Sequence, residues 1–234
     1  YGNSADLTPI MKLAKKHNLY IIEDCAQALG TTYQGKLVGT FGDISCFSFY
    51  PTKNLGAFGD GGAIATKQKQ LADKIKPWRM YGENERYKSE LVGMNSRLDE
   101  IQSACLKIKL RYLNSEIKNK RQLAQIYHQH LRGLPAEIVG QDVDGGSYHL
   151  MVVKTNQRDQ LAKYLKSKNI GTGIHYPVTI HQTPSFEYLG YREGDFPISE
   201  QASQQVLSLP MYGELSVQDV ERVVREVQTF FQKI

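Results

Sequence analysis

The chain has 234 residues, of which 41% are hydrophobic, so it can bury the core of one large domain or two smaller ones. Its 29 basic and 24 acidic residues give a net charge of +5, and the basic residues are dispersed, which argues against a dedicated nucleic-acid surface. No apolar run is long enough to cross a bilayer, and residues 1–6 do not resemble a targeting leader. We therefore expect a cytoplasmic globular protein that binds neither membranes nor nucleic acid.

Cysteine usage and the first residues add two expectations. Cys25, Cys46 and Cys105 have neither the even count of a disulfide framework nor the close spacing of a zinc site, so we expect free thiols and no metal centre. The sequence begins without methionine, in what resembles the middle of a loop. We therefore expect a fragment of a longer protein.

Hydrophobic periodicity predicts alternating helices and strands in the first half of the chain. In order, these are a helix over residues 6–17, strands over 19–22, 44–49 and 61–66, and a helix over 67–76 that closes at Pro77. The short apolar strand over 19–22 is followed by Glu23 and Asp24. This pattern is typical of a parallel strand buried on both faces, whose carboxyl end opens onto a site. A helix followed by such a strand indicates an α/β layer structure.

The second half of the chain predicts a different arrangement. Residues 79–97 are polar, aromatic and irregular, and an exposed loop of this length usually has a function. The expected elements that follow are helices over 98–113 and 116–131, a strand over 148–154, a helix over 157–168, a strand over 171–176, a helix over 198–206, a strand over 207–211 and a helix over 216–231. This order predicts a small α+β domain after a connecting pair of helices.

Lys53 is the candidate catalytic residue. It follows the strand over 44–49 and precedes four glycines between residues 56 and 62. A lysine beside small residues, with a buried carboxylate such as Asp24 within reach, is what Schiff-base chemistry on pyridoxal phosphate requires. The carboxylate keeps the pyridine nitrogen protonated, so that the ring withdraws electrons, while the lysine anchors the aldehyde and moves protons. The sequence therefore indicates a pyridoxal-phosphate enzyme.

Each of these residues also has a purely structural interpretation. Asp24 could cap a helix, Lys53 could be a solvated lysine, and the glycines could form ordinary turns. The glycines are not a mononucleotide phosphate loop, because no Gly-Lys-Ser/Thr follows at the required distance, and close backbone approach to the cofactor is their expected use. The spacing of Asp24, Ser48 and Lys53 is weak evidence for a cofactor site unless the surrounding sequence motifs are considered with it.

The surrounding sequence motifs resemble those of one family along essentially the whole chain. The motifs that carry the resemblance are Glu-Asp-Cys-Ala-Gln-Ala at 23–28, Gly-Asp-Ile-Ser-Cys-Phe-Ser-Phe at 42–49, Gly-Met-Asn-Ser-Arg-Leu-Asp-Glu at 93–100, Gly-Asp-Phe-Pro at 194–197 and Leu-Ser-Leu-Pro-Met-Tyr at 207–212. In this order they closely resemble the DegT/DnrJ/EryC1/StrS family of pyridoxal-phosphate-dependent nucleotide-sugar aminotransferases.

The resemblance implies the fold-type I aminotransferase architecture. Residues 1–113 would be the C-terminal part of a large α/β domain with a mostly parallel sheet, and residues 114–234 a small α+β domain that includes the connecting helix. The family's chain begins well before Tyr1, with a phosphate-binding Gly-Thr or Gly-Ser turn and an aromatic ring stacked on the cofactor. We therefore expect that this sequence lacks the N-terminal part and that its cofactor site is incomplete.

The resemblance also implies roles for the cofactor-site residues. Lys53 would form the Schiff base, with an amine whose pKa a desolvated pocket depresses. Asp24 would pair with the pyridine nitrogen. Gln27 would lie beside the ring, unless it is an ordinary turn amide, and Ser48 would bind the phosphate, unless it is only a small residue on a buried strand. Asn95 would reach the phosphate of a neighbouring subunit, which implies a homodimer with shared active sites.

Five further residues are candidate substrate contacts. Tyr81 and Tyr87 could line the sugar site, or could be interface aromatics. His175, Tyr176 and His181 lie in a proline-containing loop of the small domain, which faces the substrate in such enzymes. A histidine near a strand end is often only hydrogen-bonded packing, so both interpretations stay open.

The expected reaction is amino transfer from an amino acid, glutamate by family analogy, through pyridoxamine phosphate to a nucleotide-linked keto-deoxysugar. The sequence around Lys53 resembles that of family members that aminate a dTDP-3-keto-6-deoxyhexose more than that of members that act at the 4-position. The resemblance implies a role in surface-polysaccharide (lipopolysaccharide) or deoxysugar biosynthesis. Sugar 3-dehydratases of the family have histidine at the lysine position, so Lys53 argues against that activity. A 4-keto sugar aminotransferase and a truncated or non-catalytic relative that binds no cofactor remain as alternatives.

Overall fold

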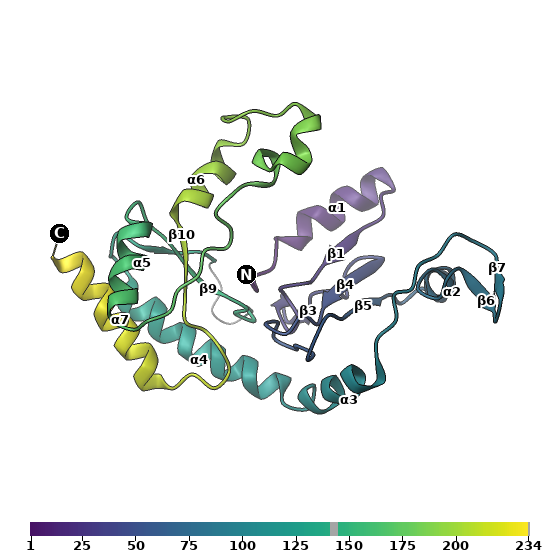
Figure 1. Cartoon of the computed structure of the whole chain (residues 1–234), viewed down its shortest axis with the longest axis horizontal. Coiled ribbons are helices and arrows are strands. Elements are labelled where there is room, and N and C mark those ends of the chain that lie inside the picture. The colour runs from purple at the N-terminus through teal and green to yellow at the C-terminus, as the bar shows by residue number, and fades with distance from the viewer. Residues whose placement is uncertain (141–144, 234) are drawn as a thin grey trace. The chain divides into compact units, whose positions relative to one another are not determined.

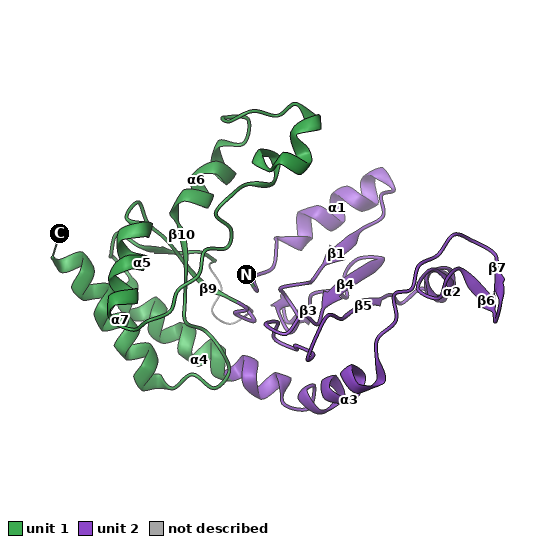
Figure 2. Cartoon of the chain, in the orientation of Figure 1, with its two compact units in different colours: residues 1, 119–143, 150–234 green, residues 2–118, 144–149 purple. Residues whose placement is uncertain are grey.

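The computed structural model describes residues 1–140 and 145–233, and these form two compact units (Figures 1 and 2). Unit 1 contains Tyr1 and the described residues of 119–143 and 150–234, whereas unit 2 contains those of 2–118 and 144–149. The boundary at residues 118 and 119 falls inside one helix, α4 (Leu113–Leu131). Each unit therefore has its own sheet and its own hydrophobic residues.

Unit 2 is built around a three-stranded sheet with the order β1–β4–β5. Its elements are α1 (Leu7–His17), β1 (Ile22–Asp24), β2 (Thr32–Tyr33), β3 (Lys36–Leu37), β4 (Ile44–Ser48), β5 (Gly62–Ala65), α2 (Lys69–Trp78), β6 (Glu83–Glu85), β7 (Lys88–Ser89), α3 (Glu100–Lys109) and the first turns of α4. β1 and β4 are parallel, whereas β4 and β5 are antiparallel. The sheet in this chain is therefore mixed and not mostly parallel, because residues 49–61 return from β4 to β5 without a crossover helix.

The first helix ends where the sequence predicts, but the first strand differs from its prediction. Asn18 closes α1 in the left-handed conformation, with φ of 52°. β1 begins at Ile22, three residues later than expected, and it lies at an edge of the sheet (Figure 1). Ile22 is 69% exposed and Asp24 is also exposed, so the prediction of a strand buried on both faces is wrong for this chain.

Two clusters of buried side chains hold unit 2 together. One cluster lies around Leu7, Cys25 and Val38, and it joins α1 to the segment after β1. The other joins the loop after Lys53 to α3 and α4, and its buried members are Leu55, Ala57, Leu106, Leu113 and Ile117. The loop that carries Lys53 is therefore packed against helices as well as attached to the sheet.

The segment after β5 is more regular than expected. The prediction that a helix closes at Pro77 is wrong, because α2 continues to Trp78. Pro77 cannot donate a backbone hydrogen bond, yet it lies inside the helix, one residue before its end. Residues 83–89, expected to be irregular, form the β6–β7 hairpin, which projects away from the β1–β4–β5 sheet in Figure 1.

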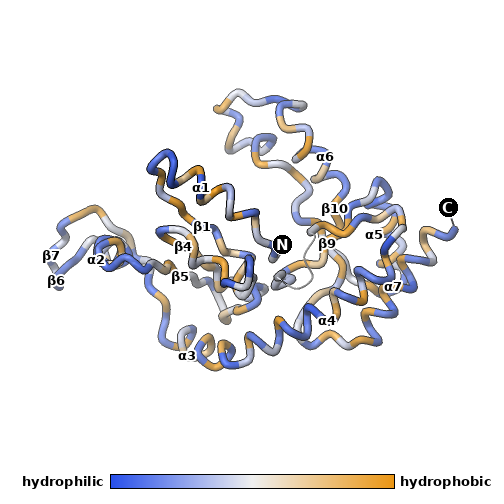
Figure 3. The backbone as a smooth tube through the Cα atoms, turned by 180° about the vertical axis from the view of Figure 1, so that it is seen from behind, coloured by the Kyte–Doolittle hydropathy of each residue, from blue (hydrophilic) through white to orange (hydrophobic). Residues whose placement is uncertain are grey.

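Unit 1 is an antiparallel sheet, of order β10–β9–β8, with helices packed on it. Its elements are the rest of α4, β8 (Glu137–Ile138), β9 (Met151–Lys154), α5 (Arg158–Ser167), η1 (Ile180–Gln182), η2 (Pro184–Leu189), α6 (Pro197–Gln205), β10 (Val206–Leu209) and α7 (Val217–Gln232). Figure 3 shows hydrophobic residues along β9 and β10, and all four residues of β10 are buried. These two strands are the centre of the unit 1 core.

One strand predicted in unit 1 does not form. Residues 171–176 contain only a single bridge, in which Gly173 pairs with Ser208 of β10. Glycines at 171 and 173 weaken strand propensity, and Pro177 cannot donate to a ladder. This segment runs instead into the loop that carries His175 and Tyr176. None of the helices in the described residues is long and apolar enough to cross a membrane.

Candidate active site

The two acids at the end of β1 have different environments, because successive strand residues face opposite sides. Glu23 is buried, and its carboxylate accepts backbone N–H groups from Gly39 at 2.6 Å, Phe41 at 2.7 Å and Gly42 at 2.6 Å. This residue, to which the sequence assigned no role, therefore fixes the loop after β3. Asp24 is exposed on the other face, where its carboxylate is accessible to a ligand.

The register of the sheet places Asp24 and Ser48 on one face. Asp24 is paired with Cys46, and Ser48 lies two residues further along β4. Because strand side chains alternate with a period of two, all three side chains lie on the same face. Asp24 Oδ1 accepts the backbone N–H of Ala26 at 3.0 Å, and Ser48 Oγ accepts that of Tyr50 at 3.3 Å. Both polar groups thus lie at the carboxyl ends of parallel strands.

Lys53 lies in the turn that follows β4. Its backbone N–H donates to Tyr50 O at 2.9 Å, and its side chain is half-buried. Burial lowers the pKa of the Lys53 amine from its ordinary value, while the Asp24 carboxylate acts in the opposite direction. Gln27 is half-buried in the turn directly after β1, where Ala28 N–H donates to Cys25 O at 3.0 Å.

The structure places Asn95, Tyr81 and Tyr87 on a separate segment. Asn95 is exposed and pairs with Met80, and both tyrosines have positive φ angles, 59° and 66°. The Arg86 guanidinium lies 4.9 Å from the centre of the Tyr87 ring. Among the described residues, no hydrogen bond joins these three side chains to Lys53 or Asp24.

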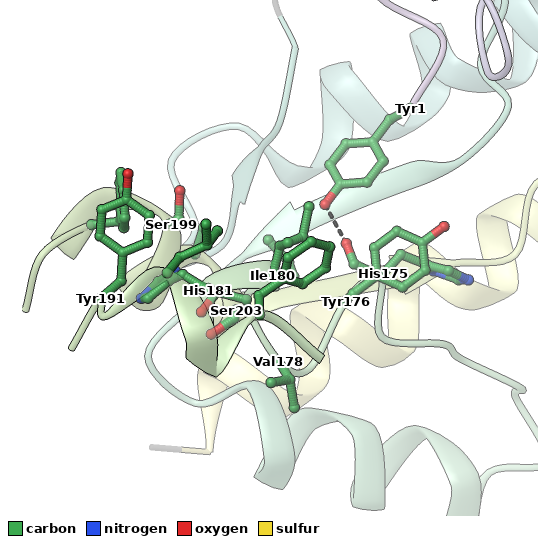
Figure 4. Close-up of a pocket in the computed structure, with 15 residues that line it drawn as sticks. Tyr1, His175, Tyr176, Val178, Ile180, His181, Tyr191, Ser199 and Ser203 are labelled. Carbon is green, nitrogen blue, oxygen red and sulfur yellow. Dashed lines mark hydrogen bonds between the residues drawn. The ribbon is translucent and has the colours of Figure 1, made fainter. Parts of the chain in front are cut away.

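The remaining predicted residues, His175, Tyr176 and His181, line a pocket of about 510 Å³ in unit 1 (Figure 4). The Tyr1 hydroxyl donates to His175 O across the pocket wall, and His175 Nδ1 shares a hydrogen bond of 2.8 Å with Ser208 Oγ. Most of the other lining side chains are apolar or aromatic. The pocket therefore offers flat apolar surfaces with few polar groups.

His181 is held by a carboxylate that the sequence analysis missed. His181 Nε2 lies 2.8 Å from Glu200 Oε1, and Glu200 also accepts the backbone N–H groups of Gly194 and Phe196. Although burial raises the Glu200 pKa, these hydrogen bonds and His181 together hold the pKa below its ordinary value. An acid in the first turn of a helix that begins at Pro197 is a capping signal, and it could have been found in the sequence.

The donor groups of unit 2 fit pyridoxal phosphate in part. A half-buried amine of lowered pKa suits an aldehyde, a nearby exposed carboxylate suits a protonated ring nitrogen, and the Ser48 hydroxyl can donate to a phosphate. In the part of the chain that the structure describes, no group of three or more His, Cys, Asp or Glu side chains could hold a metal ion. The arrangement is therefore suited to an organic cofactor bearing an aldehyde.

The fold matches solved structures of fold-type I sugar aminotransferases over part of their length. The structure of DesV from S. venezuelae in complex with a ketimine intermediate matches with a TM-score of 0.95 and 40% identity, over 100% of this chain and 64% of that chain. The chain belongs to the DegT/DnrJ/EryC1/StrS aminotransferase family, whose model matches residues 1–228. The resemblance seen in the sequence motifs is thereby confirmed.

Two relatives of the chain carry different functional names. The chain is 44% identical, over 98% of its length, to a dTDP-3-amino-3,6-dideoxy-alpha-D-galactopyranose transaminase of Aneurinibacillus thermoaerophilus. It is 40% identical, over 99% of its length, to a pleiotropic regulatory protein of Geobacillus stearothermophilus. The chain spans 63% of the length of each of these relatives. It therefore corresponds to less than two thirds of the proteins that it resembles.

Proposed function

We propose that this chain is the lysine-bearing part of a pyridoxal-phosphate-dependent aminotransferase, which moves an amino group from glutamate to a nucleotide-linked keto-deoxysugar. The observation that carries this proposal is the position of the half-buried Lys53 in the turn after β4, with Asp24 and Ser48 on one face at the carboxyl ends of the parallel strands β1 and β4. Membership of the aminotransferase family agrees with it.

Each side chain of the site would have a distinct role. When bound, pyridoxal phosphate supplies an aldehyde that carries the amino group and a ring that withdraws electrons. Lys53 Nζ would hold the cofactor and later move a proton at the reacting carbon, for which a lowered pKa is suitable. The Asp24 carboxylate would keep the ring nitrogen protonated, the Ser48 hydroxyl would bind the phosphate, and Gln27 would lie against the ring.

The whole enzyme would be a cytoplasmic homodimer that shares its active sites. Unit 2 would belong to the large domain, within a sheet that is mostly parallel in the longer protein, and unit 1 would be the small domain. Asn95 would reach the phosphate in the partner subunit, which agrees with its exposed position. Tyr81 and Tyr87, on the same segment, would contact the sugar or the partner.

The substrate that we propose is a dTDP-linked 3-keto-6-deoxyhexose, used in surface-polysaccharide or deoxysugar biosynthesis. The A. thermoaerophilus relative, at 44% identity, is named as a transaminase of a 3-amino sugar. His175, Tyr176 and His181 would contribute to the sugar-nucleotide site through the pocket of unit 1. The alternative is a 4-keto sugar, which differs only in the position that Lys53 must reach.

Two experiments test this function. The chain is incubated with pyridoxal phosphate, reduced with borohydride and mapped by mass spectrometry, and we expect the cofactor mass on Lys53 and its loss in Lys53→Arg. A version extended to the length of its relatives is then assayed for glutamate-dependent amination of 3-keto and 4-keto dTDP-sugars. Unchanged amination by the extended Lys53→Ala variant would contradict the proposal.

A non-catalytic regulatory role is the second candidate, because one relative at 40% identity is named as a pleiotropic regulatory protein. The two functions make different predictions for the same experiment. A regulatory chain would retain no cofactor on Lys53 after reduction, and its extended form would convert no keto-sugar. Cofactor retention together with amination would exclude a purely regulatory role.

A further inference from the structure

The loop that carries Lys53 is held by side chains to which the proposed chemistry gives no role. Residues 49–57 are closed into a loop by a hydrogen bond of 2.8 Å from Ala57 N–H to Phe49 O. Inside this loop Asn54, the residue after Lys53, is only 8% exposed. Buried amides are hydrogen-bonded in folded proteins, and their partners show which segments they hold together.

The Asn54 amide connects the Lys53 loop to two other segments of unit 2. Asn54 Nδ2 donates to Ser147 O at 3.0 Å and lies 3.5 Å from Leu29 O. Leu29 belongs to the turn that follows β1 and Asp24, two residues beyond Gln27. One side chain therefore bridges the segment that carries the candidate amine and the segment that carries the candidate carboxylate.

The carbonyl that Asn54 contacts is itself fixed. Ser147 N–H donates to Gly2 O at 2.9 Å, and Ser147 Oγ accepts the Thr31 hydroxyl at 2.8 Å. The Thr31 hydroxyl also lies 2.7 Å from Gly2 O, and both Thr31 and Ser147 are buried. Asn54 thus hydrogen-bonds to a buried segment whose polar groups are themselves hydrogen-bonded, and not to a solvated loop.

A second side chain holds the other end of the loop. Lys109, the last residue of α3, donates from Nζ to Gly56 O at 2.6 Å and is half-buried. A Cβ atom on Gly56 would lie 2.2 Å from Pro51 O, so the two ends of the loop touch through their backbones. Only glycine permits this approach. Lys53 is therefore carried by a loop that is closed on itself and anchored on both sides.

We propose that Asn54 is a positioning residue for Lys53, and that Lys109 is the second anchor of the same loop. Together they set how deeply the Lys53 amine is buried and how closely it approaches Asp24. The purpose of this positioning rests on the proposed function of Lys53, but the positioning itself can be measured without a cofactor. Neither Asn54 nor Lys109 has to touch the substrate.

The experiment measures the Lys53 amine in the chain without cofactor. Lysines are labelled by reductive ¹³C-methylation and titrated by NMR, with the Lys53 signal assigned through Lys53→Arg. Because burial is the larger cause of the lowered pKa, a loosened loop exposes the amine, and Asn54→Ala should shift the Lys53 pKa up toward the ordinary lysine value. The matched control is Asn119→Ala, since Asn119 Nδ2 also donates to a backbone carbonyl, Gly213 O, but in unit 1.

Lys109 supplies a second variant at a half-buried position, which removes one hydrogen bond and one positive charge. Lys109→Met should also raise the Lys53 pKa, whereas Lys107→Met, which removes the same charge from an exposed position of α3, should not. Lys109→Arg keeps a donor and should restore the wild-type titration. This series decides the question if Asn54→Ala does not fold.

The reaction with pyridoxal phosphate gives an independent measurement. At neutral pH the neutral fraction of an amine falls tenfold for each unit by which its pKa rises, so borohydride-trapped labelling of Lys53 should be slower in Asn54→Ala than in the wild type. If folded Asn54→Ala and Lys109→Met titrate at Lys53 as the wild type does, the two residues are only structural and the inference is overturned. If Lys53 is never labelled even in the chain extended to the length of its relatives, the proposed function fails, while the NMR titration still decides the positioning.

Discussion

The sheets of the two units differ in how much of their surface is buried. In unit 1 every residue of β10 and the first three residues of β9 are buried, whereas in unit 2 every residue of β5 is exposed and β1 exposes Ile22. Burial of apolar area is the main source of folding free energy. The candidate cofactor residues therefore lie on the sheet whose strands are less buried, whereas unit 1, which carries none of them, has the more deeply buried sheet.

The largest expected effect concerns the unit 1 core. Leu161 of α5 is fully buried, so Leu161→Ala should reduce the free energy of unfolding by about 2–5 kcal/mol. Ile64 of β5 is 54% exposed, and Ile64→Ala should change it by about 0.5 kcal/mol or less. Urea unfolding of both variants measures the difference. Equal losses would show that the β5 face is buried in solution.

A second effect separates the two neighbouring acids of β1. Glu23→Gln replaces one of the two carboxylate oxygens that accept three backbone N–H groups with an NH2 group, and it should cost about 1–3 kcal/mol of stability. Asp24→Asn changes an exposed side chain and should cost about 0.5 kcal/mol or less, yet it should reduce retention of pyridoxal phosphate. Chemical unfolding and cofactor trapping on the same samples give both values. The assignment of the two acids is wrong if their effects are exchanged.

A smaller effect compares a capped helix with an uncapped one. Ser216 Oγ accepts the Asp219 N–H at the start of α7 in unit 1, so Ser216→Ala should cost about 1 kcal/mol. Asp99 precedes α3 in unit 2 without a side-chain capping bond, and Asp99→Ala should cost only a few tenths of a kcal/mol through the lost helix-dipole interaction. The midpoints of denaturant unfolding, compared at a common m-value, distinguish these two losses of stability. A larger loss for Asp99 would indicate a cap that forms in solution.

The smallest effect is a pH dependence in the wall of the unit 1 pocket. The folded pKa of Glu200 lies below its ordinary value of 4.5, so its contribution to stability is present above that value and is lost as the pH falls through the folded pKa. Glu200→Gln should therefore lose less stability than the wild type between about pH 6 and about pH 3. Unfolding curves at the two pH values test this. Parallel losses would mean that the Glu200 hydrogen bonds are absent in solution.

Much of the fold was predictable because it depends on local signals. Asn18 ends α1, the apolar stripe of α7 begins after Ser216, and β4 begins at Ile44 as expected. The errors occur where neighbouring elements decide the outcome. Residues 171–176 form one bridge and not a strand, and α2 continues past Pro77. Periodicity shows which residues prefer to be buried, but it does not show which partner is available.

The candidate site divides in the same way. The sequence nominated Lys53, Asp24 and Ser48, and the register explains how Asp24 and Ser48 come to share one face. The sequence did not reveal that the Glu23 side chain faces the opposite side and accepts three backbone N–H groups. Nor did it reveal that Asn54 connects the Lys53 loop to Leu29. These contacts join residues that are at least 16 positions apart in the sequence, so no local pattern contains them.

The sequence by itself determined the family, the residue types of the candidate chemistry and most of the helices, because motifs and periodicity are carried by neighbouring residues. Only the tertiary structure decided which face each acid occupies, how deeply Lys53 is buried and which side chains hold its loop. The physical reason is that burial and hydrogen bonding are properties of segments brought together from distant parts of the chain, and these properties set the charge state on which the proposed chemistry depends.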